Sequence, residues 1–216
     1  MLGSEQIAFA VLVVTSLLAI VDPIAAVPVY LSTTAGYSPA HRRSTLRLAV
    51  VTAIIALVGF GVLGTSILQF FGITTSAFRI TGGLLFLGIG SDMLAARRSR
   101  EKATASEEHE ATHQEEVGII PLGIPTLAGP GAITTVITLV AQTRVAWQRA
   151  VIFGAIVLVM LVTWVVLELA PLLFRRMGQT GLNVVTRLMG LLVMVIGVQF
   201  IIDGVREVVL SLPARP

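Results

Sequence analysis

The sequence Pro125-Thr126-Leu127-Ala128-Gly129-Pro130-Gly131-Ala132-Ile133-Thr134-Thr135 lies within a run, residues 117–141, that contains no charged residue. A run of this length and composition is typical of a helix that spans a membrane. Each proline removes a backbone hydrogen bond and clashes with the preceding turn. Two prolines five positions apart, with glycine on both sides of the second, therefore predict a spanning helix that is broken, with a new half-helix beginning near Ala132.

Five other runs have a similar apolar character. Together the six expected spans are 7–34, the charge-free stretch between 47 and 79, 80–96, 117–141, 150–174 and 188–210. The whole chain is 55% hydrophobic and 12% charged, whereas soluble domains carry about 25% charged residues. The sequence therefore predicts an all-α integral membrane protein with six transmembrane helices in a lipid bilayer.

Composition and missing motifs exclude several other classes of protein. The 14 arginines and single lysine flank apolar runs, as charges beside membrane spans do, so no nucleic-acid partner is expected. The chain has no cysteine, which excludes disulfides and thiolate metal sites. It contains no G-x-S-x-G, H-E-x-x-H or P-loop motif. We therefore expect neither an enzyme nor a cofactor. Without a nucleotide motif, we expect any transport to be driven by a gradient or by exchange.

A polar segment divides the chain in two. Residues 97–116 are charged and lack apolar periodicity, which predicts a connector between a first domain, 1–96, and a second, 117–216. If the N-terminus lies outside, ten Lys or Arg residues fall on the inner side and five on the outer side. The excess of positive charge indicates the cytoplasmic side. We expect an inner-membrane protein with both termini outside and the connector in the cytoplasm.

The two halves also share short patterns. Pro23 and Pro28 repeat the Pro-x4-Pro spacing of the second half at an offset of 102 residues, and Arg79-Ile80-Thr81-Gly82 resembles Arg187-Leu188-Met189-Gly190 at an offset of 108. Three helices per half would insert the second copy upside down, as in many secondary transporters. The pattern predicts two inverted three-helix repeats whose helices 1 and 4 are broken, although chance similarity between apolar segments is the alternative.

The breaks are the candidate binding site. A helix that restarts inside a membrane presents unpaired N–H groups and the positive end of its dipole, which suit a carboxylate. Asp22 is the deepest clear charge, and a buried carboxylate usually faces a pathway or partner. The alternatives are packing kinks, and an N-cap role for Asp22. The candidate substrate-binding residues are Asp22, Pro23, Ala26, Pro28, Thr126, Gly129, Pro130, Gly131, Thr134 and Thr135.

Two stretches carry a family resemblance. Residues 21–29, VDPIAAVPV, look like the first signature of the MarC family of bacterial and archaeal inner-membrane proteins, and residues 121–135, PLGIPTLAGPGAITT, resemble its second. Residues 187–204 resemble its last helix. The resemblance implies six helices in related halves, distantly similar to LysE-like exporters. The chain departs from the family at Ala25-Ala26, where Gly-Asn is usual, which removes one polar side chain.

The resemblance to SnatA-like members of the family implies a transporter of small neutral amino acids such as glycine and alanine. The expected partners are therefore this substrate and a coupling proton or sodium ion, with no metal site. Two alternatives stay open: an exporter or channel for unrelated small compounds, and a non-transporting membrane partner that docks through 97–116. Glu168 interrupts the fifth span, and the sequence does not decide whether it pairs with an arginine or serves transport.

Overall fold

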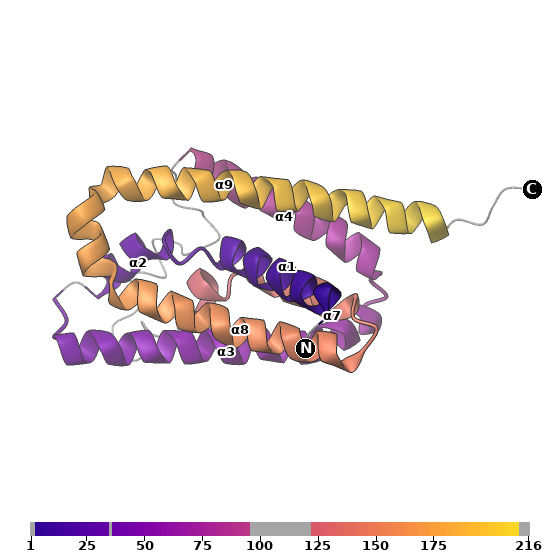
Figure 1. Cartoon of the computed structure of the whole chain (residues 1–216), viewed down its shortest axis with the longest axis horizontal. Coiled ribbons are helices and arrows are strands. Elements are labelled where there is room, and N and C mark those ends of the chain that lie inside the picture. Colours follow the sequence, from indigo (N-terminus) through magenta and orange to yellow (C-terminus); the bar gives the residue numbers. More distant parts are fainter. Residues whose placement is uncertain (1–2, 35, 96–121, 212–216) are drawn as a thin grey trace, which may run out of the picture.

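The computed structural model describes residues 3–34, 36–95 and 122–211, and these form helices joined by turns, with no strand. The predicted connector 97–116, with the neighbouring residues 117–121, lies outside the described residues. Figure 1 shows the helices running side by side along one long axis. They are α1 (Ser4–Val21), α2 (Ala26–Thr33), α3 (Pro39–Phe70), α4 (Thr75–Leu94), η1 (Leu122–Leu127), α7 (Pro130–Ala141), α8 (Ala146–Glu168) and α9 (Ala170–Ser211).

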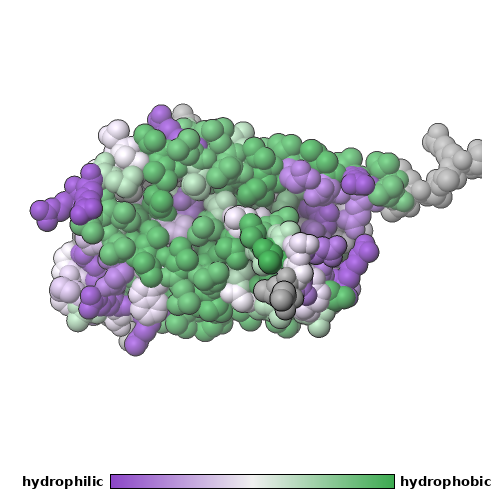
Figure 2. Space-filling model, viewed as in Figure 1, coloured by the Kyte–Doolittle hydropathy of each residue, from purple (hydrophilic) through white to green (hydrophobic). Residues whose placement is uncertain are grey.

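The surface of the bundle suits a bilayer. Five stretches of the described helices are long and apolar enough to cross a membrane, namely α1, α3, α4, α8 and residues 183–210 of α9. Figure 2 shows apolar side chains across the middle of the visible face, with polar groups towards both ends. Large apolar side chains such as Ile55, Leu161 and Val195 are exposed. A large exposed apolar surface bounded by polar rims is what lipid contact requires.

Both proline-containing segments are interrupted at the predicted places. In the first, α1 ends at Val21 and α2 begins at Ala26, so Asp22 to Ala25 form the break. In the second, η1 has extended backbone at Ile124, and α7 begins at Pro130 with Gly129 as its N-cap. Pro28 lies in the first turn of α2, where a missing N–H costs little.

Several boundaries differ from those predicted. Helix α3 begins at Pro39, and α4 begins at Thr75 and so includes Arg79, which we expected to flank the third span. Helix α8 ends at Glu168, so the fifth span is shorter than 150–174. Helix α9 extends over Ala170–Ser211 but is kinked at Gly178. Charge counting places the ends of apolar runs, whereas helices continue into the polar regions wherever capping and packing allow.

Gly178 gives a direct test of the kink. Its φ of 61° and ψ of −177° lie in a region that essentially only glycine occupies. We expect Gly178→Ala to lower the free energy of unfolding by about 1–3 kcal/mol, measured by thermal unfolding in detergent. Gly154→Ala is the control, because an added methyl there also meets open space but within regular helix. Equal stability of the two variants would contradict the strained turn.

Helices α4 and α9 pack closely and antiparallel through glycines seven residues apart. Gly83 of α4 lies against the carbonyl oxygen of Gly197, and Gly90 lies against that of Gly190. A methyl group added at Gly83 would be 2.5 Å from the Gly197 oxygen, closer than atoms can pack. Gly204 continues the series against Ser76. Small residues that let backbones touch are the usual means of helix association in membranes.

Candidate functional site

Helix α7 is the central element of the bundle. Its 12 residues extend about 18 Å at 1.5 Å per residue, less than the roughly 30 Å hydrocarbon core of a bilayer. From Gly131 to Val140 every residue except Ile133 is buried. Three of these buried residues are threonines, Thr134, Thr135 and Thr138. A short, buried helix that carries three hydroxyl groups therefore begins inside the bundle and ends near one end of it.

The start of α7 meets the end of α1. A methyl group added at Gly131 would lie 3.1 Å from Ile20 Cγ2 of α1, 3.1 Å from Ile89 Cδ1 and 3.2 Å from Phe86 Cε1 of α4. Ile20 is two residues before Asp22. The two helix breaks are therefore neighbours in the interior. Pro130 itself is exposed and Gly129 is half-buried, so the break also reaches the edge of the bundle.

Asp22 shapes the first break. Its φ of 44° and ψ of 75° place it in the left-handed region, where aspartate and asparagine are more common than other non-glycine residues. One carboxylate oxygen, Oδ1, accepts a hydrogen bond from the Ala25 N–H at 3.2 Å, and the residue is only 2% exposed. The N-cap of α2 is Ala25, not Asp22. Asp22 thus ends α1 and places a carboxylate inside the bundle.

Most of the predicted site residues lie in the interior of the bundle. Asp22, Pro23, Ala26, Thr126, Gly131, Thr134 and Thr135 are buried, whereas Pro28 and Gly129 are half-buried. The hydroxyl of Thr135 donates to the carbonyl of Gly131 at 2.9 Å, so it serves the helix in this conformation. Thr134 instead turns its methyl group towards Gly82 of α4. The two residues pack so closely that a side chain at position 82 would clash with this methyl group.

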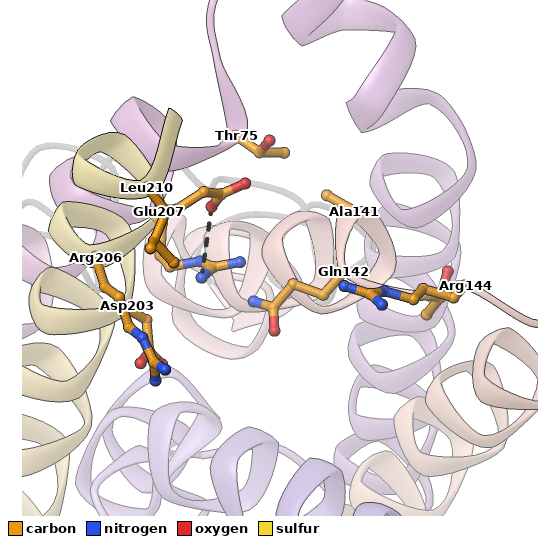
Figure 3. Close-up of a pocket in the computed structure, with 10 residues that line it drawn as sticks. Thr75, Ala141, Gln142, Arg144, Asp203, Arg206, Glu207 and Leu210 are labelled. Atoms are coloured by element: carbon orange, nitrogen blue, oxygen red, sulfur yellow. Dashed lines mark ion pairs between the residues drawn. The ribbon is translucent and has the colours of Figure 1, made fainter. Parts of the chain in front are cut away.

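A cavity of about 710 Å³ opens at one end of the bundle, where α4 begins and α7 and α9 end. Arg79, Arg144, Arg206, Asp203 and Glu207 contribute its charged groups. Figure 3 shows Asp203, Arg206 and Glu207 on one side of the cavity and Arg144 on the other, and its dashed line marks the ion pair that Glu207 makes. Arg79 Nη1 lies 3.7 Å from Glu207 Oε2. This end of the molecule is therefore polar and hollowed.

A second cavity, of about 320 Å³, lies at the opposite end, where α2, α3, α8 and α9 meet. Glu168 and Arg43 line it and form an ion pair, with Arg43 Nε 2.6 Å from Glu168 Oε1. Tyr30 lies on the same wall, and its hydroxyl donates to the Arg42 carbonyl at 3.5 Å. Glu168 therefore faces a polar cavity and an arginine, which is the pairing that the sequence left undecided.

Gly82, Thr138 and Arg79 lie in the region of the site, but the sequence did not mark them as candidate binding residues. Gly82 was noted only as part of a repeat, yet it admits Thr134. Thr138 is 2% exposed, and its hydroxyl has no hydrogen-bond partner among the described residues. Arg79 was counted as a flanking charge, but it is 9% exposed. The threonine spacing of 134 and 138 was the available signal, since such residues share one helix face.

Comparison with known proteins places the chain among membrane proteins. The family model described as "MarC family integral membrane protein" matches residues 7–209. The UPF0056 membrane protein YhcE of Escherichia coli K12 is 38% identical over 195 residues, covering 89% of each chain. A UPF0056 membrane protein of Aquifex aeolicus is 36% identical over 192 residues, covering 89% of this chain and 90% of the relative. No solved structure matches this chain significantly.

Proposed function

The chain belongs to the MarC family of integral, multi-pass membrane proteins, and we propose that it is a secondary transporter of small neutral amino acids. One observation carries the proposal: two interrupted helices adjoin inside the bundle, with the buried Asp22 at one break and the N-terminus of α7 at the other. Irregular backbone at membrane depth is tolerated where it lines a site or cavity. Discontinuous helices of this kind form the substrate sites of many transporters.

The chemistry of the two breaks is complementary to a zwitterion. The Ile133 N–H already donates to the Gly129 carbonyl at 3.0 Å, so the N–H groups of Gly131 and Ala132 are the ones placed to bind a carboxylate. The positive end of the α7 dipole favours the same anion. Asp22 supplies the opposite charge for an ammonium group. Thr134 and Thr126, both buried, add hydroxyl groups near these positions.

Close packing restricts the substrate to a small one. Gly131 is surrounded by Ile20, Phe86 and Ile89, and no large polar side chain accompanies Asp22 at the breaks. A substrate with a charged or bulky side chain would leave its polar atoms unpaired against these apolar groups, at a cost of several kcal/mol. Glycine and alanine are the amino acids that meet both restrictions. Neither Ala25 nor Ala26 offers a polar side chain, so binding of the substrate's ammonium group would depend more strongly on Asp22.

The glycine contacts support six helices in two inverted repeats. A single shift of 107 residues carries Pro23 onto Pro130, Gly83 onto Gly190 and Gly90 onto Gly197. Under that shift the contact of Gly83 with Gly197 becomes the contact of Gly190 with Gly90, which is also present. If a two-fold axis relates the two halves, each contact between α4 and α9 should have such an equivalent, and these glycine contacts do. This shift replaces the separate offsets of 102 and 108 residues.

The two polar cavities support access from both sides. They lie at opposite ends of the bundle, and the buried breaks lie between them. Transporters of this architecture work by rocking one repeat against the other around a fixed site. Arg42 and Arg43 line the cavity of Glu168. Arg47, Arg175 and Arg176 follow lining residues by four or five positions in the sequence, and this positive charge favours that end as cytoplasmic. Both termini would then be outside in an inner membrane.

Uptake of radiolabelled glycine and alanine into liposomes holding the purified protein tests this function. We expect saturable uptake that unlabelled alanine inhibits and aspartate does not. An inward proton or sodium gradient should increase the uptake rate. Protein-free liposomes are the control. No uptake under either gradient, and none in exchange for internal alanine, would contradict the proposal. Uptake that rises linearly with concentration would favour the channel alternative instead. A partner protein that docks through 97–116 would transport nothing.

A further inference from the structure

The cavity where α4 begins and α7 and α9 end carries more positive than negative charge. Three arginines, Arg79, Arg144 and Arg206, line it together with the carboxylates of Asp203 and Glu207. Asp203 also accepts a hydrogen bond from Gln199 at 3.0 Å. Arg144 and Arg206 are exposed, whereas Arg79 is buried and pairs with Glu207. The buried positive group at the base of the cavity therefore belongs to Arg79.

Arg79 is incompletely paired for a buried guanidinium. Its distance of 3.7 Å to Glu207 exceeds the range of a hydrogen bond. Its Nε is buried and makes no hydrogen bond within the described part of the chain. A buried charge is costly unless ion pairs and hydrogen bonds offset its desolvation. A carboxylate offers two oxygens in the geometry that a guanidinium binds in bidentate fashion, so a carboxylate ligand would complete this group.

The face of α7 that carries Thr134 and Thr138 extends from the helix breaks towards Arg79. On α7, Gly131, Thr134, Thr138 and Ala141 follow one face at spacings of three and four residues. Gly131 contacts Phe86 and Thr134 contacts Gly82, so this face runs antiparallel along α4. The same register brings the buried hydroxyl of Thr138 level with the turn of Arg79. Ala141 and Arg79 then line the same cavity.

We propose that this cavity is a carboxylate-binding vestibule, in which Arg79 exchanges Glu207 for the carboxylate of an arriving ligand. The vestibule would hold the ligand before it moves along the face of α7 past Thr138 and Thr134 to the breaks. Asp203 and Glu207 face the same cavity and would contact the ammonium group of a zwitterion only once its carboxylate is bound to Arg79. This inference rests on the proposed function for its substrate, but carboxylate binding at Arg79 can be measured without transport.

A single cysteine at Gln142 tests the vestibule. The chain has no cysteine of its own, and Gln142 is an exposed lining residue. Modification of Gln142→Cys by a neutral thiol reagent would be timed in nanodiscs of zwitterionic lipid, with acetate, glycine or methylamine added. We expect acetate and glycine to slow the reaction several-fold and methylamine to have no effect. Adding Arg79→Gln should abolish this protection, whereas Arg79→Lys should retain part of it.

Two further arms make the result specific. Arg206→Gln removes an exposed charge from the same cavity and should leave protection by acetate intact. Asp22→Asn should also leave it intact, so protection can persist where uptake fails, and the vestibule is judged separately from the transport function. Absence of protection by acetate, or protection that survives Arg79→Gln, would overturn the vestibule even if uptake is saturable. Protection that requires anionic lipid would overturn it in favour of a lipid headgroup site.

Discussion

Replacing Gly83 with alanine is expected to destabilise the folded protein strongly. The added methyl would lie 2.5 Å from the Gly197 carbonyl oxygen and 2.6 Å from Ile201 Cγ1. The first of these atoms is backbone, so no side-chain rotation can relieve the clash, and α4 must move away from α9. Overpacking of this kind costs about 1–3 kcal/mol and occasionally more. We expect a lower midpoint of thermal unfolding in detergent and less folded protein in the membrane.

Gly88→Ala is the matched control for this prediction. Gly88 lies on the same helix, five residues further along, and a methyl group there meets nothing within 4 Å. Because alanine favours helix over glycine by about 1 kcal/mol, this variant should be as stable as the wild type or more so. If Gly83→Ala unfolds at the same temperature as Gly88→Ala, α4 and α9 do not pack through these glycines.

Replacing Asp22 with asparagine is expected to reduce glycine uptake by roughly tenfold or more, since a hydrogen bond to a charged group contributes about 1.5–3 kcal/mol. Asparagine tolerates the left-handed backbone and can still accept the bond from the Ala25 N–H. The substitution therefore removes the negative charge and preserves the shape of the break. Initial uptake rates in proteoliposomes, corrected for the amount of folded protein, measure the effect.

Glu5→Gln provides the comparison for Asp22→Asn. Glu5 is the acidic residue within α1, and it is exposed in the first turn, so the same loss of charge there should leave uptake unchanged. Wild-type kinetics in the Asp22→Asn variant would show that Asp22 only shapes the end of α1. In that case the ammonium group of the substrate would not be bound by Asp22.

The sequence identified the breaks because their cause is local. Proline at 23, 28, 125 and 130 lacks an N–H donor and clashes with a preceding helical turn, so a helix is interrupted before it or begins close to it. Interruptions at residues 22–25 and 128–129 were therefore predictable, as was the burial of Asp22 between apolar runs. The six-helix inverted-repeat arrangement stays a prediction, because five described stretches meet the length of a membrane span and α7 is shorter.

Other features depend on packing between distant residues. Arg79 is buried because α9 brings Glu207 over it, a pairing that neither local sequence encodes. Glu168 pairs with Arg43, which lies 125 residues away. The close contact of α4 with α9 had a usable signal, since glycine recurs every seven residues at 83 and 90 and at 190, 197 and 204.

We propose a small-molecule site at the two breaks that opens to each face of the membrane in turn. Thr134→Cys tests it most directly, because cysteine is slightly smaller than threonine and Thr134 lies between α7 and α4. Thr163→Cys is the control, since Thr163 is fully buried in α8 and its hydroxyl bonds to Val159. Membrane-impermeant thiol reagent would be applied to one side of closed vesicles at a time. We predict that Thr134→Cys reacts from both sides and that alanine slows both reactions, while Thr163→Cys does not react. Reaction of Thr134→Cys from one side alone, or from neither, would contradict the account.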